Sequence, residues 1–116
     1  MKKKIKIICF DIDNVICKTS GNDYERSKPD KTGIKIINNL YDKGFYIKIF
    51  TARYMGRSKE NIKKVANKKN ETENYLKKWG LKFDELIMGK PSYDIFVDDK
   101  AFGFSSKWKK YFEKYK

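Results

Sequence analysis

Two short apolar runs, at residues 5–10 and 45–50, flank a segment whose apolar residues recur at helical spacing. Such runs of isoleucine and aromatic residues are typical of buried strands. The segment between them predicts a helix over 31–43 that ends at Gly44, with an apolar face made of Ile34, Ile37, Leu40 and Tyr41. A strand–helix–strand unit predicts two parallel strands joined by a right-handed crossover. The sequence therefore predicts an α/β fold.

The rest of the chain continues this alternation. Glycine, asparagine and proline make residues 18–30 a predicted loop. Apolar residues at helical spacing over 58–79 predict one long helix or two shorter ones, with Ser58 as the N-cap and Gly80 as the stop. Short apolar runs predict a third strand at 85–88 and a fourth at 95–97. The tail carries an aromatic stripe that predicts a C-terminal helix packed on the sheet: Trp108, Tyr111, Phe112 and Tyr115.

Length and charge limit the classes of protein to consider. A chain of 116 residues predicts one domain, residues 1–116, with no second domain. The net charge of +13 would attract nucleic acid, anionic lipid or a phosphorylated small molecule. Only Arg26, Arg53 and Arg57 are arginines, and the lysines are spread along the chain. This pattern favours solvated lysine faces over a nucleic-acid surface, which uses clustered arginines more often.

The cysteines and the N-terminus bear on the compartment. Cys9 and Cys17 are too few for a disulfide scaffold, and Cys9 falls inside a strand expected to be buried. We expect reduced thiols and a cytoplasmic protein. The first apolar run is interrupted by Lys6 and ends at Asp11, so it fits neither a signal peptide nor a membrane span. No membrane partner is expected.

Polar residues follow the predicted strands at the point where each strand ends. The carboxyl ends of parallel strands form one edge of a sheet, where ligands bind in open α/β folds. We expect six side chains at this edge: Asp11, Asp13, Thr51, Lys90, Asp98 and Asp99. Each is a weak signal alone, but their order along the chain is specific.

Read together, the four strand ends resemble the motifs of the haloacid dehalogenase superfamily of phosphatases. The matching segments are Phe10-Asp11-Ile12-Asp13-Asn14-Val15, Phe50-Thr51-Ala52-Arg53, Gly89-Lys90-Pro91 and Phe96-Val97-Asp98-Asp99. The resemblance covers residues 5 to about 104 and implies a three-layer, Rossmann-like parallel sheet flanked by helices. Asn14 stands where the family commonly has glycine, but asparagine tolerates unusual backbone angles. Neither interval that holds a cap domain in this superfamily has room for one, so the chain resembles the capless type.

The resemblance assigns Asp11 as the nucleophile and Asp13 as the general acid and base. A carboxylate nucleophile can form an aspartyl-phosphate and so divide a difficult hydrolysis into two steps. The chain contains no histidine to do this work. For proton transfer we expect the pKa of Asp13 to be raised, while Lys90 and a metal ion keep Asp11 ionised.

A metal ion is expected because an anionic nucleophile must attack an anionic phosphate. Hard oxygen ligands that retain several waters point to Mg²⁺. The resemblance implies ligation by the Asp11 carboxylate, the Asp13 backbone carbonyl and one acid of the fourth motif. We expect Asp99 to bind the metal directly and Asp98 to orient Lys90; the reverse assignment stays open.

The remaining site residues would bind substrate. Thr51, through its hydroxyl and the N–H of Ala52, and Lys90, through its charge, would hold the phosphoryl oxygens. Arg53 either reaches a second phosphate or carboxylate of the substrate or is a solvated loop residue.

These expectations amount to a Mg²⁺-dependent phosphomonoester hydrolase. The short form and the Thr-Ala-Arg motif resemble small phosphatases of bacterial capsule and surface-polysaccharide synthesis, which implies a phosphorylated sugar or a sugar-derived substrate. Without a cap, either a large substrate or a neighbouring copy in a homo-oligomer would complete the site. The alternatives are a nucleotide or nucleic-acid 3′-end phosphatase, and a non-catalytic basic protein that binds nucleic acid.

Overall fold

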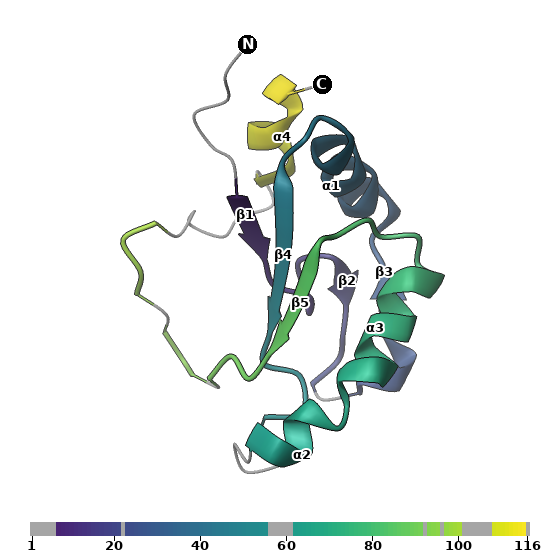
Figure 1. Ribbon diagram of the computed structural model, residues 1–116, viewed down its shortest axis with the longest axis vertical. Coiled ribbons are helices and arrows are strands. Elements are labelled where there is room, and N and C mark those ends of the chain that lie inside the picture. Colours follow the sequence, from purple (N-terminus) through teal and green to yellow (C-terminus); the bar gives the residue numbers. More distant parts are fainter. Residues whose placement is uncertain are drawn as a thin grey trace.

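The structure is a computed structural model that describes residues 7–21, 23–55, 62–91, 93–95, 97–100 and 108–115 (Figure 1). Five strands and six helical segments lie in these ranges. In chain order they are β1 (Ile7–Phe10), β2 (Cys17–Lys18), the 3₁₀ helix η1 (Tyr24–Arg26), β3 (Lys28–Pro29), α1 (Lys31–Asp42), β4 (Tyr46–Thr51), α2 (Ile62–Ala66), α3 (Lys69–Lys78), β5 (Glu85–Met88), α4 (Trp108–Phe112) and the 3₁₀ helix η2 (Glu113–Tyr115). The described chain is an α/β unit, as predicted.

The predicted strand–helix–strand unit is confirmed. β1 pairs in parallel with β4, with Ile8 opposite Ile47 and Phe10 opposite Ile49. Between them, α1 begins at its N-cap Asp30, whose side chain accepts a hydrogen bond from the Gly33 N–H at 3.1 Å.

The second crossover also matches the prediction. The segment over 58–79 divides into two helices, α2 and α3, and Ser58 lies outside the described residues. Gly80 follows with a φ of +79°, a conformation that glycine adopts without strain. β5 spans the predicted residues and pairs in parallel with β4, placing Met88 opposite Thr51.

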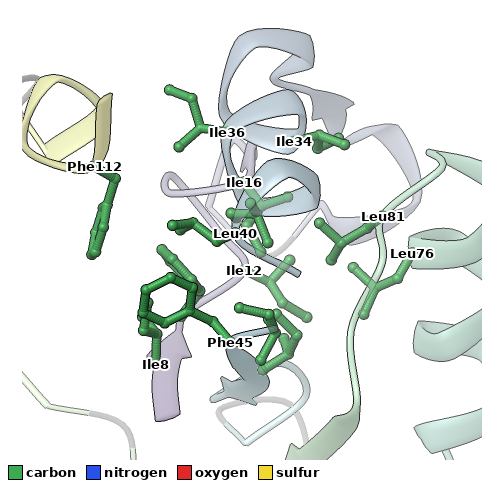
Figure 2. Close-up of a cluster of buried hydrophobic side chains, with 14 of the residues drawn as sticks. Ile8, Ile12, Ile16, Ile34, Ile36, Leu40, Phe45, Leu76, Leu81 and Phe112 are labelled. Atoms are coloured by element: carbon green, nitrogen blue, oxygen red, sulfur yellow. The ribbon is translucent and has the colours of Figure 1, made fainter. Parts of the chain in front are cut away.

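The sheet order β1-β4-β5 explains where the helices lie. Two successive right-handed crossovers that step in the same direction place their helices on the same face of a sheet. Accordingly, α1 and α3 contribute to one core with the buried side chains of β1, β4 and β5, and Figure 2 shows Leu40 and Leu76 on either side of Ile12.

The C-terminal helix α4 packs on this core through Trp108 and Phe112, whose rings lie 5.7 and 5.8 Å from that of Phe10. The predicted docking of the aromatic tail is confirmed.

The opposite face of the sheet departs from the prediction of three layers. Ile7 and Tyr46 on that face are 58% and 41% exposed, and no helix of the described residues covers them. Cys9 lies on the same face and is exposed, so its predicted burial is wrong. A strand buried on one face hides only alternate residues.

The predicted fourth strand is the second departure. Ile95 and Val97 are 82% and 90% exposed and belong to no strand, while Phe96 lies outside the described residues. The described sheet therefore has three strands. A run of three apolar residues forms a strand only when it pairs with a neighbour, and neither described residue of this run has one. Within the described residues these two departures are connected, because a helix on the uncovered face would require a crossover that returns past β1 to a further strand.

No helix in the described part of the chain combines the length and the apolar character needed to cross a membrane.

Candidate functional site

Asp11 lies directly after β1, at the carboxyl edge of the sheet. Its Oδ1 accepts a hydrogen bond from the Ile12 N–H at 2.7 Å, and its Oδ2 lies 3.3 Å from the Lys90 Nζ. Burial raises the pKa of the Asp11 carboxyl above its ordinary value, and the nearby Lys90 opposes this change without cancelling it. The lysine therefore compensates the buried charge only in part.

Lys90 reaches Asp11 because of the pairing of β4 with β5. The Lys90 N–H donates to the Thr51 carbonyl at 3.1 Å, which continues the strand pairing past Met88. Thr51 ends β4 and is fully buried. Three of the strand ends expected at one edge, those with Asp11, Thr51 and Lys90, are thus brought together, although they lie up to 79 positions apart.

Asp13 is held by a buried arginine. Arg53 donates from Nε to Asp13 Oδ2 and from Nη2 to Asp13 Oδ1, both at 3.0 Å. Thr19 Oγ1 donates a short hydrogen bond, 2.5 Å, to the same Oδ1. The Asp13 carboxylate is therefore fixed by groups from two different loops.

Arg53 is enclosed rather than presented to solvent. Its side chain is 0% exposed, and its guanidinium carbon lies 4.9 Å from the centre of the Tyr24 ring and 5.8 Å from that of Trp79. Nη2 also donates to Ser27 Oγ at 2.9 Å. Burial alone would lower the pKa of Arg53, but the hydrogen bonds to Asp13, the negative charge of Asp13 and smaller contributions from Cys17 together outweigh burial and raise that pKa. In this arrangement Arg53 binds Asp13, and its burial excludes the solvated loop residue considered from the sequence.

Sequence reasoning missed the polar residues that complete this cluster. Cys17 and Lys18 of β2 pair antiparallel with Lys28 and Pro29 of β3, so the predicted loop contains a small hairpin. The hairpin brings Thr19 Oγ1 to 2.6 Å from Ser27 Oγ. The turn residues of this segment signalled a reversal of the chain, but no pattern in the sequence singled out these two hydroxyls.

Two residues of the site loops have backbone angles that side chains rarely adopt. Asn14 has a φ of +65°, which confirms the expectation that asparagine accepts an unusual angle where glycine is common. Its Oδ1 accepts from the Thr19 N–H at 3.3 Å, which ties the turn to the hairpin. Tyr54 has a φ of +69° and is buried. For a bulky residue this conformation is strained by about 1–3 kcal/mol, a feature that gathers at functional loops.

Ala52 lies beside the strained Tyr54 and is half-buried. It packs against a second small apolar cluster over the end of the sheet, formed by Tyr24, Tyr54, Met55 and Val65. Ala52 is therefore held by this cluster, and within the same segment Thr51 Oγ1 accepts a hydrogen bond from the Arg53 N–H at 3.0 Å.

The aspartates of the fourth motif lie apart from this arrangement. Asp98 and Asp99 are exposed, and Asp98 Oδ1 accepts from the Lys100 N–H at 2.8 Å. That hydrogen bond lowers the pKa of Asp98, with a second contribution from Asp99. Within the described ranges, no three acidic, cysteine or histidine side chains are grouped closely enough to bind a metal ion. The described positions of the expected ligands therefore do not form a metal site.

Comparison with known proteins adds information about the fold. No family model matches the chain, and no curated protein matches it. A crystal structure of a structural-genomics target from Vibrio cholerae is similar, with a TM-score of 0.77 and 25% sequence identity over 97% of this chain and 100% of that one. Its name states no activity, so the similarity concerns the arrangement of the chain.

Proposed function

We propose that this chain is a phosphomonoester hydrolase of the haloacid dehalogenase type, in which Asp11 is the nucleophile. The observation that carries the proposal is the 3.3 Å contact between Asp11 Oδ2 and Lys90 Nζ at the carboxyl edge of the sheet. A lysine beside a half-buried carboxylate supplies a positive charge where an anionic phosphate would have to approach. The parallel sheet and the crossovers support a Rossmann-like arrangement of this type.

The chain's own residues divide into two groups. Lys90 and the backbone after Thr51 would hold the phosphoryl oxygens. The Asp11 carboxylate would then attack phosphorus and form the aspartyl-phosphate. The ester P–O bond would break, and the leaving oxygen, which keeps the bonding electrons, would accept the proton of Asp13. In the second step, water would attack the aspartyl-phosphate and give a proton back to Asp13. Cleavage of the bond between phosphorus and the Asp11 oxygen would release phosphate and restore both carboxyl groups.

Mg²⁺ is the cofactor that we propose for this chemistry, where it would neutralise the charge of nucleophile and phosphate. Its ligands would be the Asp11 carboxylate, the Asp13 carbonyl and one of Asp98 and Asp99. Since the described positions of these acids are not grouped, this assignment requires the segment over 97–100 to approach Asp11.

For the substrate we propose a phosphorylated sugar or a sugar-derived intermediate, as in capsule and surface-polysaccharide synthesis. A nucleotide or nucleic-acid end phosphatase is the second candidate, favoured by the net charge of +13. Rates with sugar phosphates, nucleotides and 3′-phosphorylated oligonucleotides distinguish the two. Preference for oligonucleotides with a steep dependence on salt would identify the second candidate, because salt weakens binding to a phosphate backbone.

The covalent mechanism is tested with p-nitrophenyl phosphate. Asp11→Asn is expected to lower phosphate release by at least about 10³-fold, because the amide cannot form the aspartyl-phosphate. Asp42→Asn, an exposed aspartate paired with Lys82 at 2.8 Å, is the matched control and should retain full activity. Acid-quenched wild-type protein should carry one phosphoryl group on the peptide that contains Asp11. Release at the wild-type rate by Asp11→Asn would refute the mechanism.

A further inference from the structure

The hydrogen bonds around Asp13 point to a role for a residue of the second motif. We propose that Arg53 is a positioning residue, which fixes the Asp13 carboxyl group in the orientation needed for proton transfer to the leaving oxygen. This inference rests on the proposed function, in which Asp13 is the acid and base. It gives Arg53 a role that needs no contact with substrate.

The geometry of the pair fixes the plane of the carboxyl group. Nη2 of Arg53 donates to Asp13 Oδ1 at 3.0 Å, and Nε donates to Oδ2 at 3.0 Å and, more weakly, to Oδ1 at 3.2 Å. Two parallel bonds from a planar guanidinium set both the position and the rotation of a carboxylate, whereas a lysine would set only a distance. Arg53 therefore orients Asp13 rather than only balancing its charge.

Arg53 is itself fixed from several sides. Its side chain is fully enclosed, with the Tyr24 ring 4.9 Å from the guanidinium carbon and Ser27 Oγ 2.9 Å from Nη2. Its backbone N–H donates to Thr51 Oγ1 at 3.0 Å. The residue that orients the acid is thus linked to Thr51, which directly precedes the backbone proposed to hold the phosphoryl oxygens.

The two oxygens of Asp13 are not equivalent. Oδ1 accepts from Arg53 Nη2 at 3.0 Å, from Arg53 Nε at 3.2 Å and from Thr19 Oγ1 at 2.5 Å. Among the described residues, Oδ2 accepts only from Arg53 Nε. Oδ2 therefore has the free lone pair that can carry the transferred proton, and Asp13 is 21% exposed, which leaves it accessible to a leaving group. The guanidinium stabilises the carboxylate that remains after the proton has left.

A substrate-binding role for Arg53 is the competing explanation. The side chain has one nitrogen, Nη1, that is buried without a hydrogen-bond partner in the described structure. The whole Arg53 side chain is 0% exposed, so a ligand could reach this nitrogen only if neighbouring side chains moved. The closed surroundings favour positioning, and the two roles predict different kinetics.

The test compares two leaving groups. An alkoxide needs a proton as it departs, whereas p-nitrophenolate is stable without one, so only the first reaction depends on a well-placed acid. The probes are β-glycerol phosphate and p-nitrophenyl phosphate. Arg53→Lys keeps the charge but loses the fork, and Asp13→Asn removes the acid. Arg26→Lys is the matched control, since Arg26 is 87% exposed and lies 3.8 Å from its partner Asp23.

Arg53→Lys is expected to lower kcat for β-glycerol phosphate by about 100-fold, the effect of a misplaced catalytic group, with little change in KM. The loss with p-nitrophenyl phosphate should be much smaller. Asp13→Asn should show the same difference between the substrates, and the double variant should lose no more than Asp13→Asn alone, because the two residues act as a unit. Arg26→Lys should behave as wild type with both substrates.

Other results would overturn the inference. A raised KM with unchanged kcat would assign Arg53 to substrate binding, and equal losses with both substrates would exclude a role through the acid. Thermal unfolding checks that Arg53→Lys is folded. If it is not, Thr19→Val, which removes one hydrogen-bond donor to Asp13, replaces it. This variant must then show a smaller loss of kcat, again larger with β-glycerol phosphate than with p-nitrophenyl phosphate. If wild type and Asp11→Asn release phosphate equally, the proposed function fails. If only the difference between the substrates is absent, the inference fails alone.

Discussion

Two regions of the molecule carry aspartates beside apolar residues, and the structure treats them differently. In the unit β1–α1–β4, each of Asp11, Asp13 and Asp30 contacts a basic residue from a distant part of the chain: Lys90, Arg53 and Lys109. In the segment over 91–100, Asp98 accepts a hydrogen bond from the Lys100 N–H, only two residues away. Its apolar neighbours Ile95 and Val97 are largely exposed.

The difference shows what makes an acidic residue part of a site. The run before Asp11 pairs with β4, and this pairing brings the carboxyl edges of three strands together. The run before Asp98 has no paired neighbour at its described residues, so its acids stay in solvent. An acidic motif that follows an apolar run therefore indicates a site only where that run pairs as a strand of the sheet.

Among the tests of this contrast between the two regions, Mg²⁺ binding has the largest expected effect. If Mg²⁺ draws the second region to Asp11, Asp99→Asn should weaken Mg²⁺ binding by about 100-fold or more, because a charged oxygen ligand is lost. Calorimetric titration with Mg²⁺ alone measures this without substrate. Asp98→Asn should have a weaker effect, and Asp94→Asn, another exposed aspartate in the same segment, should have none.

The same titration followed by NMR gives a second readout. Amide signals over 97–100 should shift on addition of Mg²⁺, and Asp11→Asn should abolish the shifts. If Asp98→Asn and Asp99→Asn both bind Mg²⁺ as wild type does, the fourth motif takes no part in metal binding. The two regions would then be independent, as they are in the structure.

The local elements could be predicted from the sequence because their signals are local. α1 lies within the predicted residues 31–43, and β5 matches the predicted strand at 85–88. In both cases apolar periodicity and a flanking glycine act over a few residues. The contact of Lys90 with Asp11 followed from the same elements once two parallel pairings were assumed.

Features that depend on distant parts of the chain could not be predicted. The exposure of Cys9 depends on which face of the sheet is covered, and an apolar run of six residues does not contain that information. Arg53 meets Asp13 across 40 positions, through a loop that includes the strained Tyr54. Sequence patterns suggest that such a residue is near the site, but loop geometry and side-chain packing decide which partner it binds.

A smaller effect concerns Asp30, the N-cap of α1, which forms an ion pair with Lys109. Burial raises the pKa of Asp30, but the hydrogen bonds from Lys109 and from the Gly33 N–H, with the charge of Lys109, together outweigh it, so the pKa lies below its ordinary value of 3.8. A lowered pKa stabilises the folded state above pH 3.8, and this contribution is lost as the pH falls through the folded-state pKa. Asp30→Asn keeps the cap and removes the charge, so it should cost about 1 kcal/mol at pH 7, limited by solvent screening.

Urea unfolding at several pH values measures this contribution. The difference between wild type and Asp30→Asn should shrink as the pH falls below 3.8. Asp98→Asn is the same substitution in the second region and should leave unfolding unchanged, since Asp98 is exposed. A difference for Asp30→Asn that persists unchanged in acid would show that the ion pair with Lys109 is not its source.

The smallest expected effect tests whether the second region is unpaired in solution. Val97 is 90% exposed, so Val97→Ala should change the free energy of unfolding by less than about 0.5 kcal/mol. Ile47→Val, at a fully buried position of β4, removes a single methyl group and should cost about 1 kcal/mol, measured by urea unfolding. Hydrogen exchange should protect the Ile47 amide, which donates to Asp84 Oδ2 at 2.8 Å, far more than the Val97 amide. Equal costs and equal protection would mean that residues 95–97 pair as the strand predicted from the sequence, and the contrast between the two regions would then disappear.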